Sequence, residues 1–325
     1  MKIVGTIVEY NPLHNGHIYA INKIKRLSQA DGIVVILSGN FTMRGDLSIF
    51  DKFEKTRQCL KAGIDLVIEL PFVCAVQNAD LFAKNAIYLL HLAQVHEIWI
   101  GSESNNPTLY KECYQKWIKP ASQEKIKELL ALGYSYKEAT ASIINLPSND
   151  LLGFSYYKAI EEFNYSMKLN TIKRIGNYDS TEAKEYASAY AIRRNLSLLP
   201  SYCPPYVDAT LIREKDSVFP YLKYKILSST PTELKEIFFV EEGLENKLKE
   251  ISNFSSSTDF IDFLATKRYT KSRIQRMLAY ILFNITKKDM EDKEINFIRV
   301  LGYSSIGKTY LNQIKKNGII YTNIK

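Results

Sequence analysis

Short runs of consecutive apolar residues recur through the first third of the chain, each about the length of a buried strand. Between them lie stretches in which apolar residues recur at helical spacing. The pattern predicts strands at 3–9, 32–37, 65–70 and 97–101. It predicts helices at 15–28, 51–62 and 78–92. This alternation is typical of an α/β protein with a doubly wound parallel sheet, because parallel strands need crossover helices on the faces of the sheet.

The alternation becomes less regular after the fourth predicted strand. Residues 104–165 are mostly helical in pattern, with interruptions at Pro120 and Pro147. A fifth strand is predicted at 168–172, and a helix at 181–195. The first part of the chain therefore carries more helix than a minimal doubly wound unit requires.

Three prolines, Pro200, Pro204 and Pro205, mark the clearest candidate for a domain boundary. Beyond them the pattern is helical, with helices predicted at 219–227, 244–251 and 270–285. We expect an α/β domain over 1–205 and a mainly helical domain over 206–325.

The turn after the first predicted strand carries His14, Gly16 and His17, an HxGH motif that leads into the first predicted helix. The first turn of a helix has unpaired N–H groups and the positive end of the helix dipole, and both favour an anion. Two imidazoles three residues apart can donate to phosphate oxygens from the same side of that turn. Gly16 leaves room for a nucleoside, so the motif predicts a nucleoside triphosphate site.

Two other interpretations of the histidines stay open. The pair could cap the helix and have only a structural role. A zinc site is disfavoured, because no third His, Cys or acidic residue stands at ligand spacing, and we expect no metal ligated by the protein. Gly101, after the fourth predicted strand, lies at the same edge of the sheet as the motif, where ligands of doubly wound sheets bind.

Charge is unevenly distributed. The chain has a formal net charge of +8, and residues 261–325 hold 13 Lys and Arg against 5 Asp and Glu, which accounts for the whole excess. A basic end on a neutral body suggests a polyanionic partner, although a lysine-rich solvated helix surface would give the same composition.

The remaining composition is that of a cytoplasmic protein. Four cysteines are scattered without metal-ligand spacing, which is typical of reduced thiols. The sequence has no signal peptide pattern, and its apolar runs are far shorter than the ~20 residues of a membrane span. A homodimer stays open.

Several blocks of the sequence resemble the bacterial tRNA(Met) cytidine acetate ligases, a family of HxGH nucleotidyltransferases. The blocks lie in order over nearly the whole chain, and the later ones are found in fewer kinds of protein than the first. They are VEYNPLHNGH (8–17), SGNFTMRGD (38–46), DLVIELP (65–71), IGSE (100–103), SNDLLGFSY (148–156), KRYTKSRIQR (267–276) and RVLGYSSIGK (299–308). Met43 stands where the resemblance leads us to expect glutamine.

The resemblance implies a HIGH-type, Rossmann-like nucleotidyltransferase domain followed by a basic, mainly helical domain. It implies an enzyme that activates acetate with ATP, releasing diphosphate, and transfers the acetyl group from acetyl-adenylate to the wobble cytidine of elongator tRNA(Met). ATP is the implied cofactor, with Mg²⁺ accompanying it. Acetate and elongator tRNA(Met) are the implied partners.

The resemblance also implies site residues. His14, His17 and Arg174 are the expected catalytic groups. Asp150 is an alternative to Asn149 as an ATP contact. The expected nucleotide-binding residues are Ile7, Val8, Glu9, Tyr10, Asn11, Pro12, Leu13, His14, Asn15, Gly16, His17, Ile18, Tyr19, Ala20, Gly101, Asn149, Arg174, Ile175, Ser188 and Arg193. The expected RNA-binding residues are Lys267, Arg268, Lys271, Arg273 and Arg276.

Two other functions remain open on the sequence. One is an adenylyltransferase of cofactor biosynthesis, of the phosphopantetheine or nicotinate mononucleotide kind, although such chains are usually shorter and lack a basic helical domain. The other is a non-catalytic RNA-binding protein with a degenerate nucleotide fold, which the intact HxGH motif argues against.

Overall fold

The fold is organised around one sheet, in which the strands follow the order β5-β4-β1-β2-β3-β6-β7. The computed structural model describes residues 1–134, 136–174, 186–241, 243–267, 269–291, 295–315 and 319–322. The strands are β1 (Ile3–Val8), β2 (Gly32–Ser38), β3 (Leu66–Leu70), β4 (Glu97–Ser102), β5 (Lys168–Lys173), β6 (Phe297–Tyr303) and β7 (Ile319–Tyr321). The first five pair in parallel, which confirms the predicted doubly wound α/β class.

β2 lies in the middle of the sheet and shows why apolar runs mark its strands. Every residue of β2 is buried. Val34 and Ile36 point into one hydrophobic cluster, while Ile33, Val35 and Leu37 point into another on the opposite face. A strand covered on both faces needs apolar residues at every position, so a continuous run replaces the alternation of a half-buried strand.

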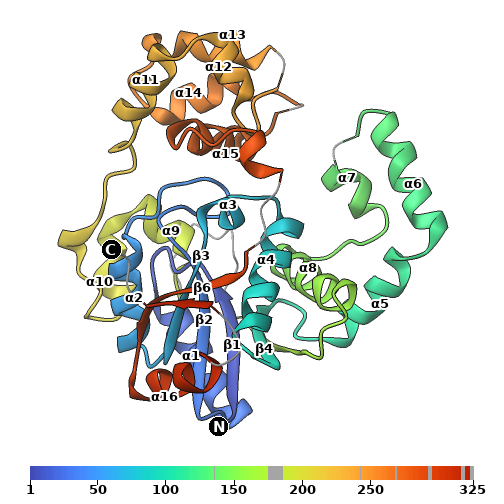
Figure 1. Cartoon of the computed structure of the whole chain (residues 1–325), viewed down its shortest axis with the longest axis vertical. Helices are drawn as coiled ribbons and strands as arrows, with labels where there is room; N and C mark the ends of the chain where they lie inside the picture. The colour runs from blue at the N-terminus through green and yellow to red at the C-terminus, as the bar shows by residue number, and fades with distance from the viewer. Residues whose placement is uncertain are drawn as a thin grey trace.

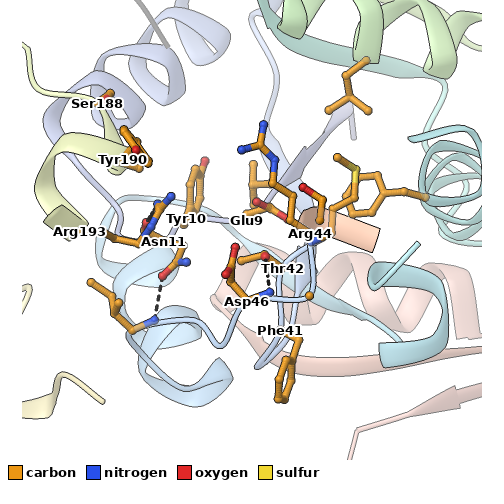
Figure 2. A pocket seen from close by; sticks show the side chains of 18 of the residues that line it. Glu9, Tyr10, Asn11, Phe41, Thr42, Arg44, Asp46, Ser188, Tyr190 and Arg193 are labelled. Atoms are coloured by element: carbon orange, nitrogen blue, oxygen red, sulfur yellow. Dashed lines mark hydrogen bonds between the residues drawn. The ribbon is translucent and has the colours of Figure 1, made fainter. Parts of the chain in front are cut away.

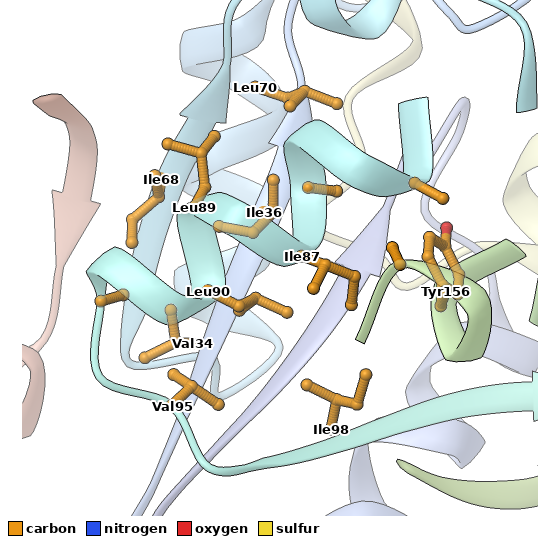
Figure 3. Close-up of a cluster of buried hydrophobic side chains, with 14 of the residues drawn as sticks. Val34, Ile36, Ile68, Leu70, Ile87, Leu89, Leu90, Val95, Ile98 and Tyr156 are labelled. Carbon is orange, nitrogen blue, oxygen red and sulfur yellow. The ribbon is translucent and has the colours of Figure 1, made fainter. Parts of the chain in front are cut away.

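Helices cover both faces of the sheet. α1 (Asn15–Ser28) and α2 (Lys52–Lys61) lie on one face. α4 (Ala79–Leu92) and α8 (Ser148–Glu162) pack together on the other. Figure 3 shows the cluster beneath α4, where Ile87 and Leu90 meet Val34 and Ile36. The short helix α3 (Phe72–Ala75) connects β3 to α4.

An arm of three helices leaves the sheet between β4 and α8 (Figure 1). Its helices are α5 (Thr108–Trp117), α6 (Pro120–Ala131) and α7 (Tyr136–Ala141). Pro120 is the first residue of α6 and Pro147 the N-cap of α8, so at each interruption indicated by the sequence a new helix begins.

The segment after β5 differs from its prediction. The predicted helix 181–195 falls partly outside the described residues, and in the described part the helix α9 is confined to Ala189–Arg194. Its N-cap Ser188 has an extended backbone, so the helix begins after that residue. A short helix α10 (Leu199–Tyr202) follows.

A helical lobe stands over the carboxyl ends of the parallel strands (Figure 1). It consists of α11 (Phe219–Ser228), α12 (Pro231–Glu236), α13 (Leu244–Leu248), α14 (Ser257–Leu264) and α15 (Lys271–Leu282). Its hydrophobic core also takes in Phe41 and Val76 from the loops of the sheet domain. The lobe is therefore packed directly onto the edge of the sheet where ligands were expected.

The end of the chain was expected to belong to the helical domain, and in this part the expectation is wrong. β6 pairs antiparallel with β3, and α16 (Ser305–Ile314) and β7 follow it in the sheet domain. The sequence signal is weak because β6 is buried only at alternate positions near its start. Its partner strand also lies far away in sequence, so no local pattern could indicate the pairing.

Asp65 holds the segment formed by β6 and α16 against β3 through hydrogen bonds. Its backbone carbonyl accepts from the Ser304 N–H at 2.9 Å, and its carboxylate accepts from the Ser304 hydroxyl at 2.7 Å and the Ile33 N–H at 3.0 Å. Gly307 packs against the same carbonyl, since an added Cβ would lie 1.9 Å from the Asp65 oxygen. None of the helices in the described residues is both long and apolar enough to cross a lipid bilayer.

Replacing Gly307 by alanine is expected to lower the free energy of unfolding by about 1–3 kcal/mol, because the methyl group must push α16 away from β3. Thermal unfolding of the variant measures this loss. Ser305→Ala, on the exposed first turn of α16, is the control and should unfold within a degree or two of the parent. Equal midpoints for the two variants would contradict the close packing at Asp65.

Candidate functional site

A pocket of about 920 Å³ lies between the carboxyl ends of the strands and the helical lobe. We call it the central pocket; Figure 2 shows it from close by. The sheet side contributes the HxGH motif and Gly101, and the lobe contributes residues such as Phe219 and Lys271. Its volume is at the upper end of the ~300–1,000 Å³ range of small-molecule sites, so it can hold a nucleotide together with a second substrate.

The two histidines of the motif cap α1 reciprocally. The Nδ1 of His14 accepts from the Gly16 N–H at 3.1 Å, and the Nδ1 of His17 accepts from the His14 N–H at 3.3 Å. The rings stack with their centroids 3.6 Å apart. Because each Nδ1 accepts a hydrogen bond, the proton of each neutral ring is on Nε2. Both residues line the pocket, so each Nε2–H is available to a bound anion.

Burial keeps these rings neutral. It lowers the pKa of His14 from its ordinary value to about 3, with further contributions from the charges of Arg174 and Arg193. Burial also lowers the pKa of His17 well below its ordinary value, with His14 and Arg174 as smaller causes. The site thus combines two neutral donors with two arginines that stay charged, an arrangement that favours a multiply charged anion such as a triphosphate.

Arg193 and Ser188, both expected nucleotide contacts, line the central pocket. The Nη1 of Arg193 donates to the Asn11 carbonyl at 2.5 Å, and the Asn11 Oδ1 accepts from the Ile49 N–H at 2.8 Å. The Ser188 hydroxyl accepts from the Ala191 N–H at 3.0 Å and starts α9. These bonds fix α9 against the turn after β1.

Gly101, Asn149 and Arg174, which are also expected nucleotide contacts, lie together near the ends of β4 and β5. A Cβ on Gly101 would lie 3.2 Å from the Cγ of Arg174, and the Nη1 of Arg174 donates to the Asn149 Oδ1 at 3.3 Å. Asp150 is fully buried and accepts from the Tyr110 hydroxyl and the Ser104 N–H, both at 2.8 Å. Its carboxylate is therefore used inside the fold, and Asn149 is the residue that reaches the pocket.

Some expected nucleotide contacts are not among the residues that line the pocket. Leu13 is fully buried in the cluster beneath α1. Pro12, Asn15 and Ile18 adjoin the motif without being part of the lining. Ile175 lies outside the described residues.

The loop between β2 and α2 contributes side chains that sequence reasoning missed. Thr42, Met43, Arg44 and Asp46 all line the pocket. The loop is held from below by the buried Lys55, whose Nζ donates to the carbonyls of Ser38 at 2.7 Å and Gly39 at 3.0 Å. The available signal was the position of the block at 38–46, directly after the second predicted strand.

The basic block borders the lobe side of the pocket, but much of its charge is already paired. Lys271 lines the pocket and forms an ion pair with Asp262 at 2.6 Å. Arg273 forms an ion pair with Glu241. Arg276 is half-buried, and Lys267 is exposed. Arg268 lies outside the described residues, so Lys267 and Lys271 are the block's most accessible described cations.

The described residues contain no group of three or more His, Cys, Asp or Glu placed to hold a metal ion. Cys59, Cys74, Cys113 and Cys203 are buried free thiols. Burial raises the pKa of Cys59 and of Cys203 to about 12, so neither is a thiolate near neutral pH.

The sequence matches a known family and several curated proteins. The family described as HIGH Nucleotidyl Transferase matches residues 1–325. The chain is 36% identical to the tRNA(Met) cytidine acetate ligase of Geobacillus sp. (strain WCH70), over 98% of this chain and 87% of that protein. It is 38% identical to the protein of the same name from Oceanobacillus iheyensis, over 98% and 88%. It is 35% identical to that of Bacillus subtilis, over 97% and 85%.

The fold is similar to solved structures of one protein from Thermotoga maritima. The structure of TmcAL bound with alpha-thio ATP superposes with a TM-score of 0.87 at 29% identity, covering 99% of this chain and 86% of that one. The apo form of TmcAL gives a TM-score of 0.89 at 28% identity, covering 100% and 86%.

The lowered pKa of His14 predicts a dependence of stability on pH. Below the ordinary pKa near 6.5, His14 is protonated in the unfolded chain but stays neutral in the folded one. The free energy of unfolding therefore decreases as the pH falls towards about 3. Between about pH 7 and pH 5 this costs about 2 kcal/mol. Chemical denaturation at the two pH values measures it. His14→Gln, which cannot protonate, should lose about 2 kcal/mol less than the parent; equal losses would contradict a neutral His14.

Proposed function

Since the chain belongs to the HIGH nucleotidyl transferase family and, within it, to the tRNA(Met) cytidine acetate ligases, we propose that it activates acetate with ATP and acetylates the wobble cytidine of elongator tRNA(Met). The observation that carries the proposal is the reciprocal cap of His14 and His17 beside Arg174 and Arg193. This arrangement supplies donors and positive charge where the triphosphate must bind. The similar fold of a relative bound to an ATP analogue supports the same use of the pocket.

In the first step an oxygen of acetate attacks the α-phosphorus of ATP. The new O–P bond forms as the bond from the α-phosphorus to the bridging oxygen breaks, and diphosphate leaves with that electron pair. Negative charge grows on the leaving group and on the α-phosphoryl oxygens. The Nε2–H groups of His14 and His17 and the guanidinium groups of Arg174 and Arg193 are placed to stabilise it. The product is acetyl-adenylate.

In the second step the exocyclic amine of cytidine attacks the acetyl carbonyl carbon. The C–N bond forms, the bond from the carbonyl carbon to the phosphate oxygen breaks, and AMP leaves as the amine loses a proton to water. The amine is a weak nucleophile because its lone pair is delocalised into the ring, so it requires an acyl donor with a good leaving group. The product is N-acetylcytidine at the wobble position.

The helical lobe is the part of the chain that we assign to the tRNA. It covers the pocket and brings Lys215 and Lys271 to its rim, with Lys267 exposed nearby. Lysine and arginine contacts to phosphates give affinity that does not depend on base sequence. The anticodon loop is single-stranded, so its cytidine can enter the pocket without the melting of a duplex.

The remaining partners follow from this reaction. Mg²⁺ accompanying ATP would be coordinated mainly by phosphate oxygens and water, which is how Mg²⁺ is usually bound with nucleotides. The four buried free thiols fit a reducing compartment, and we place the reaction in the cytoplasm. The homodimer stays a prediction.

Replacing His17 by alanine is expected to lower acetate-dependent exchange of diphosphate into ATP by about 100-fold or more, because a donor to the transition state is lost. The exposed His96→Ala is the matched control and should retain full exchange. Circular dichroism and the thermal midpoint establish that both variants fold. Normal exchange in His17→Ala would overturn the assignment of the site.

Replacing Lys267 and Lys271 together by alanine is expected to weaken tRNA binding by about tenfold or more and to reduce the slope of log affinity against log salt by about 2. Exchange of diphosphate into ATP should remain unchanged, because this step needs no tRNA. A double variant of Lys308 on α16 and Lys315, the C-cap of that helix, is the control, because both are exposed at the end of the molecule away from the lobe. Equal tRNA affinity in the two double variants would show that Lys267 and Lys271 do not bind the tRNA.

A further inference from the structure

We propose that the acid substrate binds on the β2 side of the histidine pair, with its carboxylate towards Arg44 and its methyl group against Met43, and that Met43 sets the size limit that selects acetate. The inference rests on the proposed function and deepens it. It assigns the acid-binding wall to the loop between β2 and α2.

The order of the strands divides the pocket. Two of the groups assigned to the nucleotide, Gly101 and Arg174, stand at the ends of β4 and β5, and the HxGH motif follows β1. The order β5-β4-β1-β2 then places the loop after β2 on the other side of the motif. Met43 and Arg44 of that loop therefore lie across the motif from Gly101 and Arg174, while the other two nucleotide groups, Ser188 and Arg193, reach the pocket from α9.

The direction of the reaction favours the same side. In-line displacement requires the attacking oxygen to lie opposite the leaving diphosphate. In Figure 2, Ser188, Tyr190 and Arg193 lie on one side of Tyr10, and Arg44 lies on the other. If diphosphate leaves towards the cation Arg193, acetate must approach from the side of Arg44.

The chemistry of this wall fits a short carboxylic acid. Arg44 is exposed into the pocket and offers a permanently charged guanidinium, a group well matched to a carboxylate. Glu9 lies nearby, and its Oε1 accepts from the Met43 N–H at 2.6 Å. Its negative charge repels a second carboxylate, which directs the acid's charged end towards Arg44 and leaves its methyl end for the apolar surface.

The apolar surface is closely packed. Phe82 and Tyr156 line the pocket while being only 2% and 4% exposed, and both belong to the main hydrophobic cluster. Met43 packs against that cluster and is held by its backbone bond to Glu9. A closely packed wall cannot retreat to admit a longer chain. One methylene in an apolar pocket typically changes kcat/KM by about 10–200-fold, and this is the preference for acetate over propionate that the wall must supply.

The test compares acid-dependent exchange of diphosphate into ATP with acetate, propionate and butyrate. Met43→Ala is expected to raise the ratio of kcat/KM for propionate over acetate by about tenfold. Met43→Gln preserves the length of the side chain and should keep the preference of the parent. Met167→Ala is the matched control, because Met167 packs against the same cluster outside the pocket. A ratio in Met43→Ala no higher than in Met167→Ala would overturn the size limit.

A second variant tests the carboxylate contact. Arg44→Gln is expected to raise the KM for acetate about tenfold and to leave the KM for ATP within about twofold of the parent. An unchanged KM for acetate, or an equal rise for ATP, would contradict the assignment of Arg44. The parent enzyme distinguishes failure of the proposed function from failure of this inference. Exchange of diphosphate into ATP in the absence of any acid would contradict the proposed function itself. Acetate-dependent exchange that neither variant alters defeats only this inference.

Discussion

Two hydrogen bonds at the start of α1 constrain the whole site. Because the ring nitrogens of His14 and His17 each accept from a backbone N–H, the rings can neither rotate nor change tautomer without uncapping the helix. Burial excludes protonation, so the same bonds decide which nitrogen carries the proton. The hydrogen bonds that cap α1 therefore also hold the two rings in the orientation proposed for phosphate recognition. The structural interpretation of the histidine pair, left open by the sequence, is compatible with the functional one.

The loop between β2 and α2 depends on parts of the chain that are remote from it in sequence. At its end, Lys52 pairs with the buried Glu69 at 2.9 Å, and Arg299 from β6 reaches the same carboxylate at 3.0 Å. The Asp46 Oδ1 accepts from the Gln275 side chain at 2.7 Å, which joins the loop to α15. The loop is therefore supported both by β6 and by the helical lobe, and it lies where we propose that the two substrates of the first step meet.

Signals that are local in sequence were predictable, and those that depend on tertiary pairing were not. The run at 32–37 predicts a buried strand because a strand covered on both faces needs apolar residues at every position. The HxGH motif predicts its site because its residues are close together in sequence. β6 was not predicted, because only its pairing with β3 makes it a strand of the sheet. Similarly, the sequence presents Arg273 as a free cation, whereas the fold pairs it with Glu241, 32 positions earlier. Arg44 escaped because its role follows from strand order.

The antiparallel pairing of β6 with β3 has a consequence for biosynthesis. A ribosome delivers β1 to β5 and then the helical lobe before β6 emerges, so the parallel core can assemble while the outer edge of β3 is still open. That edge belongs to a fully buried, mainly apolar strand, and its unpaired backbone groups can pair with strands of other chains. A nascent chain stalled within the lobe thus exposes the aggregation-prone edge of β3 on a nearly complete fold, and β6 covers that edge once it has been synthesised.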